Sequence, residues 1–174
     1  MTNALPVNGR ATDSQFAQNP LPLAHAMGVA LAELHGQRPA EELVPQTAAE
    51  VEGALNFLDG LDHDETPPAP FGRVRVSSVR QALNEPPLFG TPVHTHGSPI
   101  TAVAVVIDSK VIYESAGTDG LDPPERDLAI VMRSISETWT SEVTTAFMDG
   151  YIDGGGELPS GPALDWYGVV AAFR

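Results

Sequence analysis

Cysteine is absent from this chain of 174 residues, which excludes disulfides, thiolate metal ligands and a cysteine nucleophile. Lysine is almost absent too, since Lys110 is the single one. No apolar run approaches the roughly 18 residues that a membrane span needs, so we expect no contact with a membrane. The opening residues lack the basic start and apolar core of a secretory signal. We therefore expect a cytoplasmic protein, or a virion protein if a phage encodes it.

Positive charge is scarce, because acidic residues outnumber basic ones by 23 to 9 and the formal net charge is -14. A field of this sign repels the phosphate backbone of nucleic acids, so we expect no direct nucleic-acid binding. The charge permits a protein partner or self-assembly, and it also suits an acidic inhibitor that imitates nucleic acid. Solubility alone is a further explanation of the charge.

Proline and polar residues divide the chain into three parts. Residues 1–22 mix Asn, Gln, Pro and Thr without periodicity, which predicts an extended arm. Residues 59–70 are acidic and then rich in proline, which blocks helix formation and predicts a linker. We expect residues 71–174 to form the main core.

Two amphipathic helices are predicted between the arm and the linker. Apolar residues recur at helical spacing over residues 23–35 and over residues 47–60. Thr47 and Glu50 have the spacing of a capping box at the start of the second helix. We interpret residues 23–66 as a helical hairpin.

The middle of the chain contains the apolar stretch ITAVAVVIDSKVIYES, residues 100–115. Two apolar runs flank the polar residues Asp108, Ser109 and Lys110, which predicts a β-hairpin with a tight connection. Both faces of the first run are apolar, so we expect this strand to be covered on two sides.

The last third is predicted to begin with a helix over residues 123–148, in which Asp122 serves as the N-cap and Pro123 as the first helical residue. A break near Thr140 is the alternative, because Ser and Thr weaken helix propensity there. Residues 165–174 are interpreted as a closing strand. The predicted fold class is α+β, with an N-terminal helical hairpin, a small mostly antiparallel sheet, a long C-terminal helix and that closing strand.

Residues 74–115 carry a short strand, the pattern V-x-x-V-R-x-A-L, a proline-containing turn, the pattern T-P-V-x-x-x-G and a closing hairpin. In this outline the stretch resembles a small module of uncharacterised proteins from GC-rich bacteria and their phages. The resemblance implies an α/β unit in the middle of the chain and a phage or mobile-element origin. It implies no activity.

His94 and His96 form the candidate metal site. Their spacing places both imidazoles on the same side of a strand, where they can supply two nitrogen ligands to a divalent ion. The candidates for a third ligand are His63, Asp62, Asp64 and Glu114. The alternative is that both histidines face water, and no other cofactor is expected.

The chain carries no dense catalytic signature, such as a nucleophile elbow or a phosphate-binding glycine loop. We therefore expect a non-enzymatic acidic interaction or assembly protein, possibly a phage or mobile-element component. A small metal-binding protein or metal-dependent hydrolase that uses His94 and His96 is one alternative. An acidic inhibitor of a nucleic-acid-binding protein is the other.

Overall fold

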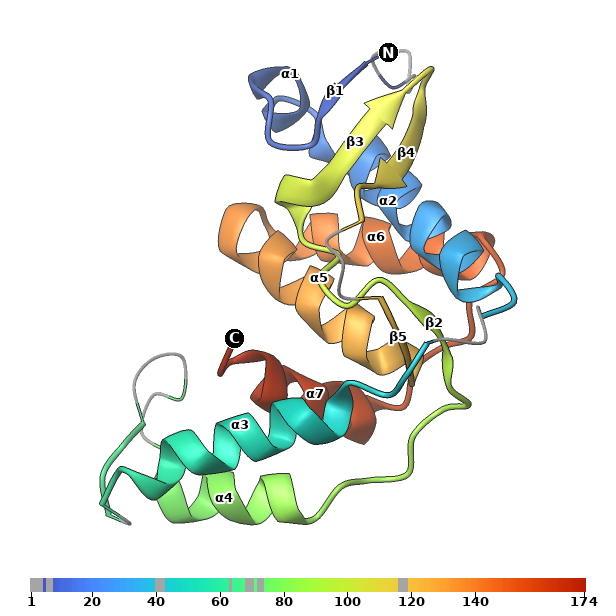
Figure 1. Cartoon of the computed structure of the whole chain (residues 1–174). Coiled ribbons are helices and arrows are strands. Elements are labelled where there is room, and N and C mark those ends of the chain that lie inside the picture. Colours follow the sequence, from blue (N-terminus) through green and yellow to red (C-terminus); the bar gives the residue numbers. More distant parts are fainter. Residues whose placement is uncertain are drawn as a thin grey trace.

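The computed structural model describes residues 5, 8–39, 43–62, 64–67, 71, 74–115 and 119–174. Its helices are α1 (Ser14–Ala17), α2 (Pro20–His35), α3 (Thr47–Asp59), α4 (Val76–Asn84), α5 (Pro124–Thr138), α6 (Ser141–Asp153) and α7 (Gly161–Ala171). Its strands are β1 (Asn8–Arg10), β2 (Val93–Thr95), β3 (Ala104–Ile107), β4 (Lys110–Tyr113) and β5 (Gly120–Asp122). Helices and small antiparallel sheets occur together, so the predicted α+β class is confirmed at this level (Figure 1).

The predicted hairpin is present as β3 and β4, which pair antiparallel with Val105 opposite Ile112. Its two-residue turn consists of Asp108 and Ser109, whose φ angles are 49° and 62°. Positive φ at both central residues suits the right-handed twist of the flanking strands. β1 pairs with the other edge of β3, so the order of this sheet is β1-β3-β4.

The expectation that the hairpin is covered on two sides is wrong. Ala104, Val106 and Val111 are buried, whereas Ile107 and Ile112 keep 47% and 46% of their surface exposed. α2 packs against the sheet through β4, and an antiparallel sheet can leave its other face open to solvent.

Residues 8–22 of the segment that we expected to form an extended arm contribute to the core instead. β1 contributes a strand to the sheet, and the Phe16 side chain of α1 is buried in the larger hydrophobic cluster. No periodic pattern marks these elements, because they are only 3 and 4 residues long.

The predicted helical hairpin is also wrong, because α2 and α3 pack on different partners. α2 lies against α6, where a Cβ on Gly28 would overlap the carbonyl oxygen of Phe147 and a Cβ on Gly150 would overlap that of His25. Glycine therefore brings the two helix backbones into direct contact. α3 packs instead on α4 and α7.

The C-terminal third contains helices where we expected one helix and a strand. The single helix expected over residues 123–148 is wrong, because the extended residues Trp139 and Thr140 separate α5 from α6. The alternative, a break near Thr140, is what the structure contains. The predicted closing strand is wrong, since the segment forms α7. Trp166, Tyr167 and Val170 are buried at helical spacing. A short apolar run can be a buried strand or a buried helix, and its pattern alone does not separate the two.

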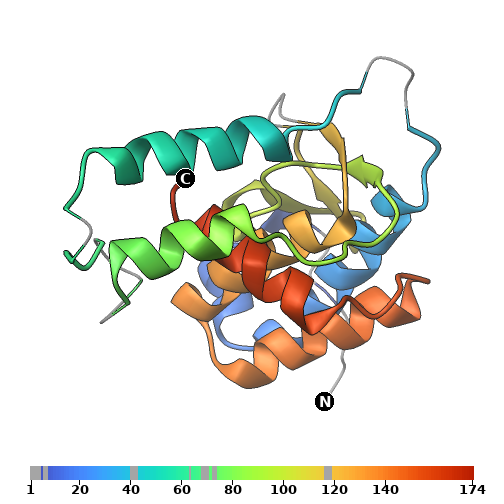
Figure 2. The ribbon, with the colours of Figure 1, turned by 90° about the horizontal axis from the view of Figure 1, so that it is seen from below.

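Two hydrophobic clusters lie on opposite sides of α5. The first joins α2 and α6 with the sheet, and the second joins α3, α4 and α7 (Figures 1 and 2). Leu128, Val131 and Ile135 of α5 belong to the first cluster and Ala129 belongs to the second. Among the described residues, no helix has the length and hydrophobicity to cross a membrane.

Candidate functional site

Charged side chains are buried where α5 begins. Asp122 ends β5, and Glu125, Arg126 and Asp127 lie in the first turn of α5; each is at most 3% exposed. Asp, Glu and Arg are almost never fully buried unless they are paired. The groups that pair with these buried charges therefore show which segments the start of α5 holds in place.

Asp127 fixes the backbone of the loop that follows β2. The N–H groups of His96 and Gly97 donate to its two carboxylate oxygens at 2.6 and 2.9 Å. Gly97 has a φ of 81°, a conformation that suits glycine. Burial alone would raise the pKa of the Asp127 carboxyl, but its contacts with His35, the His96 N–H and Arg126 hold the pKa below the usual range.

The Asp127 carboxylate also holds the end of α2. The Nε2 of His35 lies 3.2 Å from Oδ2 of Asp127, and its Nδ1 lies 2.9 Å from the hydroxyl of Tyr151. The imidazole and the tyrosine ring meet edge to face, with centroids 5.6 Å apart. A continuous series of polar contacts therefore runs from α6 through α2 to the loop after β2.

Asp122 caps a helix other than the one that we expected. Its carboxylate accepts hydrogen bonds from the N–H groups of Gln46 and Thr47 and from the Thr47 hydroxyl, so it caps α3 and not α5. The Thr47 hydroxyl lies 3.0 Å from that of Tyr167. Burial is the main reason why the pKa of Tyr167 rises to about 12.

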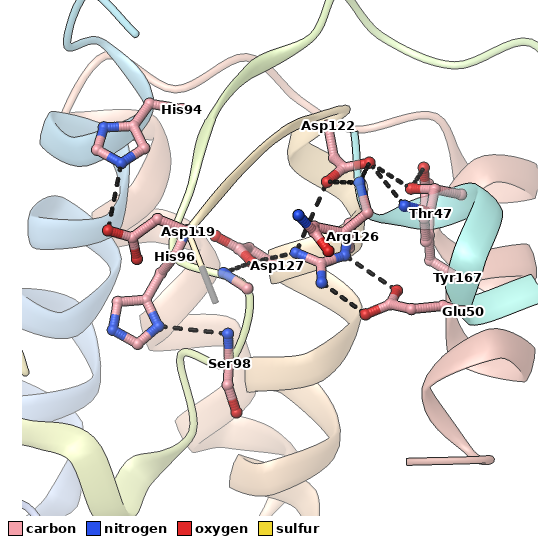
Figure 3. A network of polar contacts seen from close by, with 12 residues as sticks. Thr47, Glu50, His94, His96, Ser98, Asp119, Asp122, Arg126, Asp127 and Tyr167 are labelled. Atoms are coloured by element: carbon pink, nitrogen blue, oxygen red, sulfur yellow. Dashed lines mark hydrogen bonds and ion pairs between the residues drawn. The ribbon is translucent and has the colours of Figure 1, made fainter. Parts of the chain in front are cut away.

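Arg126 connects α5 to α3 and, through Glu50, to the C-terminus. Its Nε and Nη2 donate to the two Glu50 oxygens at 3.0 and 2.6 Å, which is a bidentate arrangement. Arg174 Nη2 lies 3.2 Å from the same carboxylate, and Arg174 Nη1 donates to the Gly97 carbonyl at 2.6 Å. Figure 3 shows the pair of Arg126 and Glu50, with Asp122 and Asp127 beside it.

Of the predicted metal ligands, His94 lies in β2 and His96 in the loop that follows it, on the side away from Glu50 (Figure 3). His94 Nε2 is 3.9 Å from Oδ2 of Asp119. His96 Nε2 is 2.8 Å from the Glu114 carbonyl oxygen, and its Nδ1 accepts the Ser98 N–H at 3.3 Å.

Among the residues that the structure describes, the candidate side chains for a third metal ligand are not seen to join His94 and His96. His63 lies outside the described residues. The Glu114 carboxylate pairs with Arg10 at 2.9 Å. Within the described ranges, no three His, Asp or Glu side chains gather where they could hold a metal ion. The metal site stays a prediction.

Comparisons with known proteins identify the fold. No family model and no curated protein sequence matches the chain. Among solved structures it is similar to an aminoglycoside-3'-phosphotransferase of type VIII, with a TM-score of 0.74 and 18% identity over 98% of this chain and 67% of that one. It is also similar to a choline/ethanolamine kinase family protein from Mesorhizobium loti, with a TM-score of 0.59 and 20% identity over 91% of this chain and 50% of that one. The chain shares a fold with these two proteins.

The shared fold contradicts the expectation of a non-enzymatic interaction or assembly protein. Both similar structures are named for phosphoryl transfer, one as a phosphotransferase and one as a member of a kinase family. Neither similar structure is named for the two alternatives, a metal-dependent hydrolase and an inhibitor of nucleic-acid-binding proteins. The resemblance of residues 74–115 to a bacterial and phage module, and the protein partner, remain predictions.

Cavities flank the loop after β2. A cavity of about 310 Å³ between α2 and β4 is lined by His96, Tyr113 and Asp119. Another of about 350 Å³, between α5 and the end of α7, is lined by Ser98 and Arg174. The loop therefore presents side chains to open space on two sides while Asp127 holds its backbone.

Sequence reasoning missed Asp127, although the sequence contains a signal for it. Asp127 precedes Val131 and Ile135 at intervals of four residues, so it extends the buried stripe of α5 by one turn. A carboxylate at an apolar position of a helix requires buried hydrogen-bond donors. The position of those donors, 30 and 31 residues earlier in the chain, depends on the tertiary fold.

Proposed function

We propose that this protein transfers a phosphoryl group from a nucleoside triphosphate to a hydroxyl group of a small organic cation, with β2 and the loop after it as the reaction centre. The observation that carries the proposal is the pair of hydrogen bonds from His96 and Gly97 to Asp127, within a fold shared with a phosphotransferase and a kinase-family protein. Phosphoryl transfer depends mostly on positioning and electrostatics, and a rigidly held loop supplies the positioning.

The acceptor class follows from charge and from the two similar proteins. A net charge of -14 attracts cations to the molecule. The names of the two similar structures refer to an aminoglycoside and to choline or ethanolamine, which are nitrogen-based cations that carry hydroxyl groups. This chain spans only part of either protein, so their activity is transferred to it here as a proposal.

The proposed reaction requires a base for the acceptor proton. The acceptor oxygen bonds to the γ-phosphorus, the bond from that phosphorus to the bridging oxygen breaks, and a nucleoside diphosphate leaves. The proton passes to the imidazole of His94, which Asp119 faces at 3.9 Å. An imidazole suits this role because its ordinary pKa lies near neutral pH.

The divalent cation that accompanies a nucleotide needs oxygen ligands. Mg²⁺ is commonly held by one or two carboxylates together with substrate phosphates and water. Asp119 lines the cavity beside the loop and offers a partly exposed carboxylate, a donor type that fits the ion. The Glu114 carboxylate is also partly exposed, although it pairs with Arg10. When bound, the cation would neutralise phosphate charge.

Mass spectrometry of the full chain mixed with ATP, Mg²⁺ and kanamycin, choline or ethanolamine tests the proposal. We expect a phosphorylated acceptor, and a kcat at least about 100-fold lower for His94→Gln, the usual scale for a lost general base. His25→Gln is the matched control, since His25 forms a surface pair with Asp153 at 3.0 Å, and its kcat should not change. The proposal fails if no acceptor is phosphorylated, or if His94→Gln keeps the wild-type kcat.

A further inference from the structure

A separate cavity of about 520 Å³ lies between the end of α2, the segment before β2, the start of α5 and the connection from α6 to α7. Its titratable lining residues are His35, Glu125, Tyr151 and Glu157. No arginine or lysine is among the described residues that line it. The cavity is therefore acidic, and it is distinct from the two cavities beside the loop.

The Glu125 carboxylate has an unused hydrogen-bonding oxygen in this cavity. Glu125 is 3% exposed, and its buried Oε2 has no hydrogen-bond partner among the described residues. The carboxylate faces the backbone of Gly90, where a Cβ would lie 3.3 Å from Oε2. The position of Glu125 in the first turn of α5 offsets part of the cost of burying its charge. A buried carboxylate oxygen without a donor is costly, and a ligand that donates a hydrogen bond would remove that cost.

Other negative charges act on the same space. The pKa of Tyr151 is raised, first by burial and then by the charges of Glu125, Asp127 and Glu157. Burial is the largest cause of the raised pKa of Tyr151 and says nothing about a ligand. The three carboxylates that act on this cavity wall, however, create a potential that attracts cations.

The rim of the cavity is apolar. Leu88 and Leu158 are among its lining residues and keep 92% and 80% of their surface exposed. Exposed leucines beside a buried carboxylate match a molecule with an apolar part and one charged end.

We propose that this cavity binds a small organic cation with a primary ammonium group and a short apolar chain. The ammonium group donates to Oε2 of Glu125, and the apolar chain lies against Leu88 and Leu158. A metal ion fits less well, because the described residues contain no cluster of three His, Asp or Glu ligands. The inference uses only the cavity and does not depend on the proposed phosphoryl transfer.

Titration calorimetry of the full chain with n-propylammonium chloride tests the inference, with 1-propanol as the neutral ligand of similar shape. Ionic strength is matched with sodium chloride. We expect n-propylammonium to bind at least about tenfold more tightly than 1-propanol, and Glu125→Gln to weaken it by at least about tenfold. Glu137→Gln, at the far end of α5, is the control and should leave its affinity unchanged.

Two results would overturn the inference: equal affinities for the amine and the alcohol, or unchanged amine affinity in Glu125→Gln. Thermal unfolding separates lost binding from lost structure, because removing a buried charge that lacks a partner should leave the melting temperature unchanged or raise it. If Glu125→Gln does not fold, Gly90→Ala decides the question. Its methyl group would crowd Oε2 and should weaken amine binding at least about tenfold, and unchanged affinity would refute the site.

Discussion

Replacing Asp127 by Asn is the sharpest test of how the loop after β2 is held. The substitution keeps the side-chain volume but removes the charge to which His96 N–H, Gly97 N–H and His35 Nε2 are directed. An amide has only one acceptor oxygen, so its NH₂ group must face one of the two backbone donors. That donor then loses its partner in a site from which water is excluded.

The expected loss of stability is about 4 kcal/mol, within the range for breaking a buried charged contact on one side. Because domains are stable by only about 5–15 kcal/mol, this is a large fraction of the total. At a urea dependence of about 2 kcal/mol per molar, the unfolding midpoint should fall by about 2 M. Asp153→Asn removes an exposed partner of His25 and should cost less than about 1 kcal/mol.

Urea unfolding at several pH values gives the second half of this test. The folded-state pKa of Asp127 is lowered from 3.8, so the unfolded state binds more protons in acid and the stabilising effect is lost as pH falls through the folded value. The difference in the free energy of unfolding between wild type and Asp127→Asn should therefore be largest at neutral pH and should shrink below about pH 4. A difference under about 1 kcal/mol at pH 7, or one that does not change in acid, would contradict the reasoning.

Three further predictions concern packing, the hairpin turn and burial. Gly28→Ala should cost at least about 3 kcal/mol in urea unfolding because its Cβ overlaps the α6 backbone, whereas Gly53→Ala, with open space around it in α3, should gain about 0.5–1 kcal/mol. Ser109→Gly should raise the free energy of unfolding by about 1 kcal/mol, because glycine has no steric penalty at a φ of 62°. An unchanged urea midpoint would contradict a positive φ at this residue. The pKa of every tyrosine is raised mainly by burial, so tyrosinate absorbance at pH 10 should be nearly absent in the folded protein and half-maximal in urea; equal absorbance in both states would contradict this. The three tyrosines are Tyr113, Tyr151 and Tyr167.

The sequence pattern correctly predicted those helices and strands whose formation depends on neighbouring residues in the chain. The hairpin of β3 and β4 follows from two β-branched runs and a polar connection. The positions of α2 and α3 follow from helical spacing. The break at Trp139 and Thr140 is the alternative that weak helix propensity left open beside one continuous helix.

The errors arise where tertiary contacts decide the outcome. Residues 161–171 are mostly apolar, so the choice of helix over strand depends on how α7 packs against α4 and α5. The pairing of α2 with α6 depends on Gly28 and Gly150, which are more than 120 residues apart and become informative only when the two backbones meet. The donors around Asp127 come from α2 and the loop after β2, and no periodic pattern connects these segments.

The buried charges of α5 are better explained by what they hold in place than by stability. Replacing buried ion pairs by apolar side chains is often neutral or stabilising, so stability alone does not account for charged residues at these positions. Asp122 and Arg126 attach α3, Asp127 attaches α2 and the loop, and Arg174 attaches the C-terminus through Glu50. An apolar replacement would fill the same volume but would leave the loop backbone without acceptors and free to take other conformations. A loop that must present side chains in one geometry requires directed contacts of this kind, which is why we place the reaction centre there and not in the larger apolar cavity between α3 and α4.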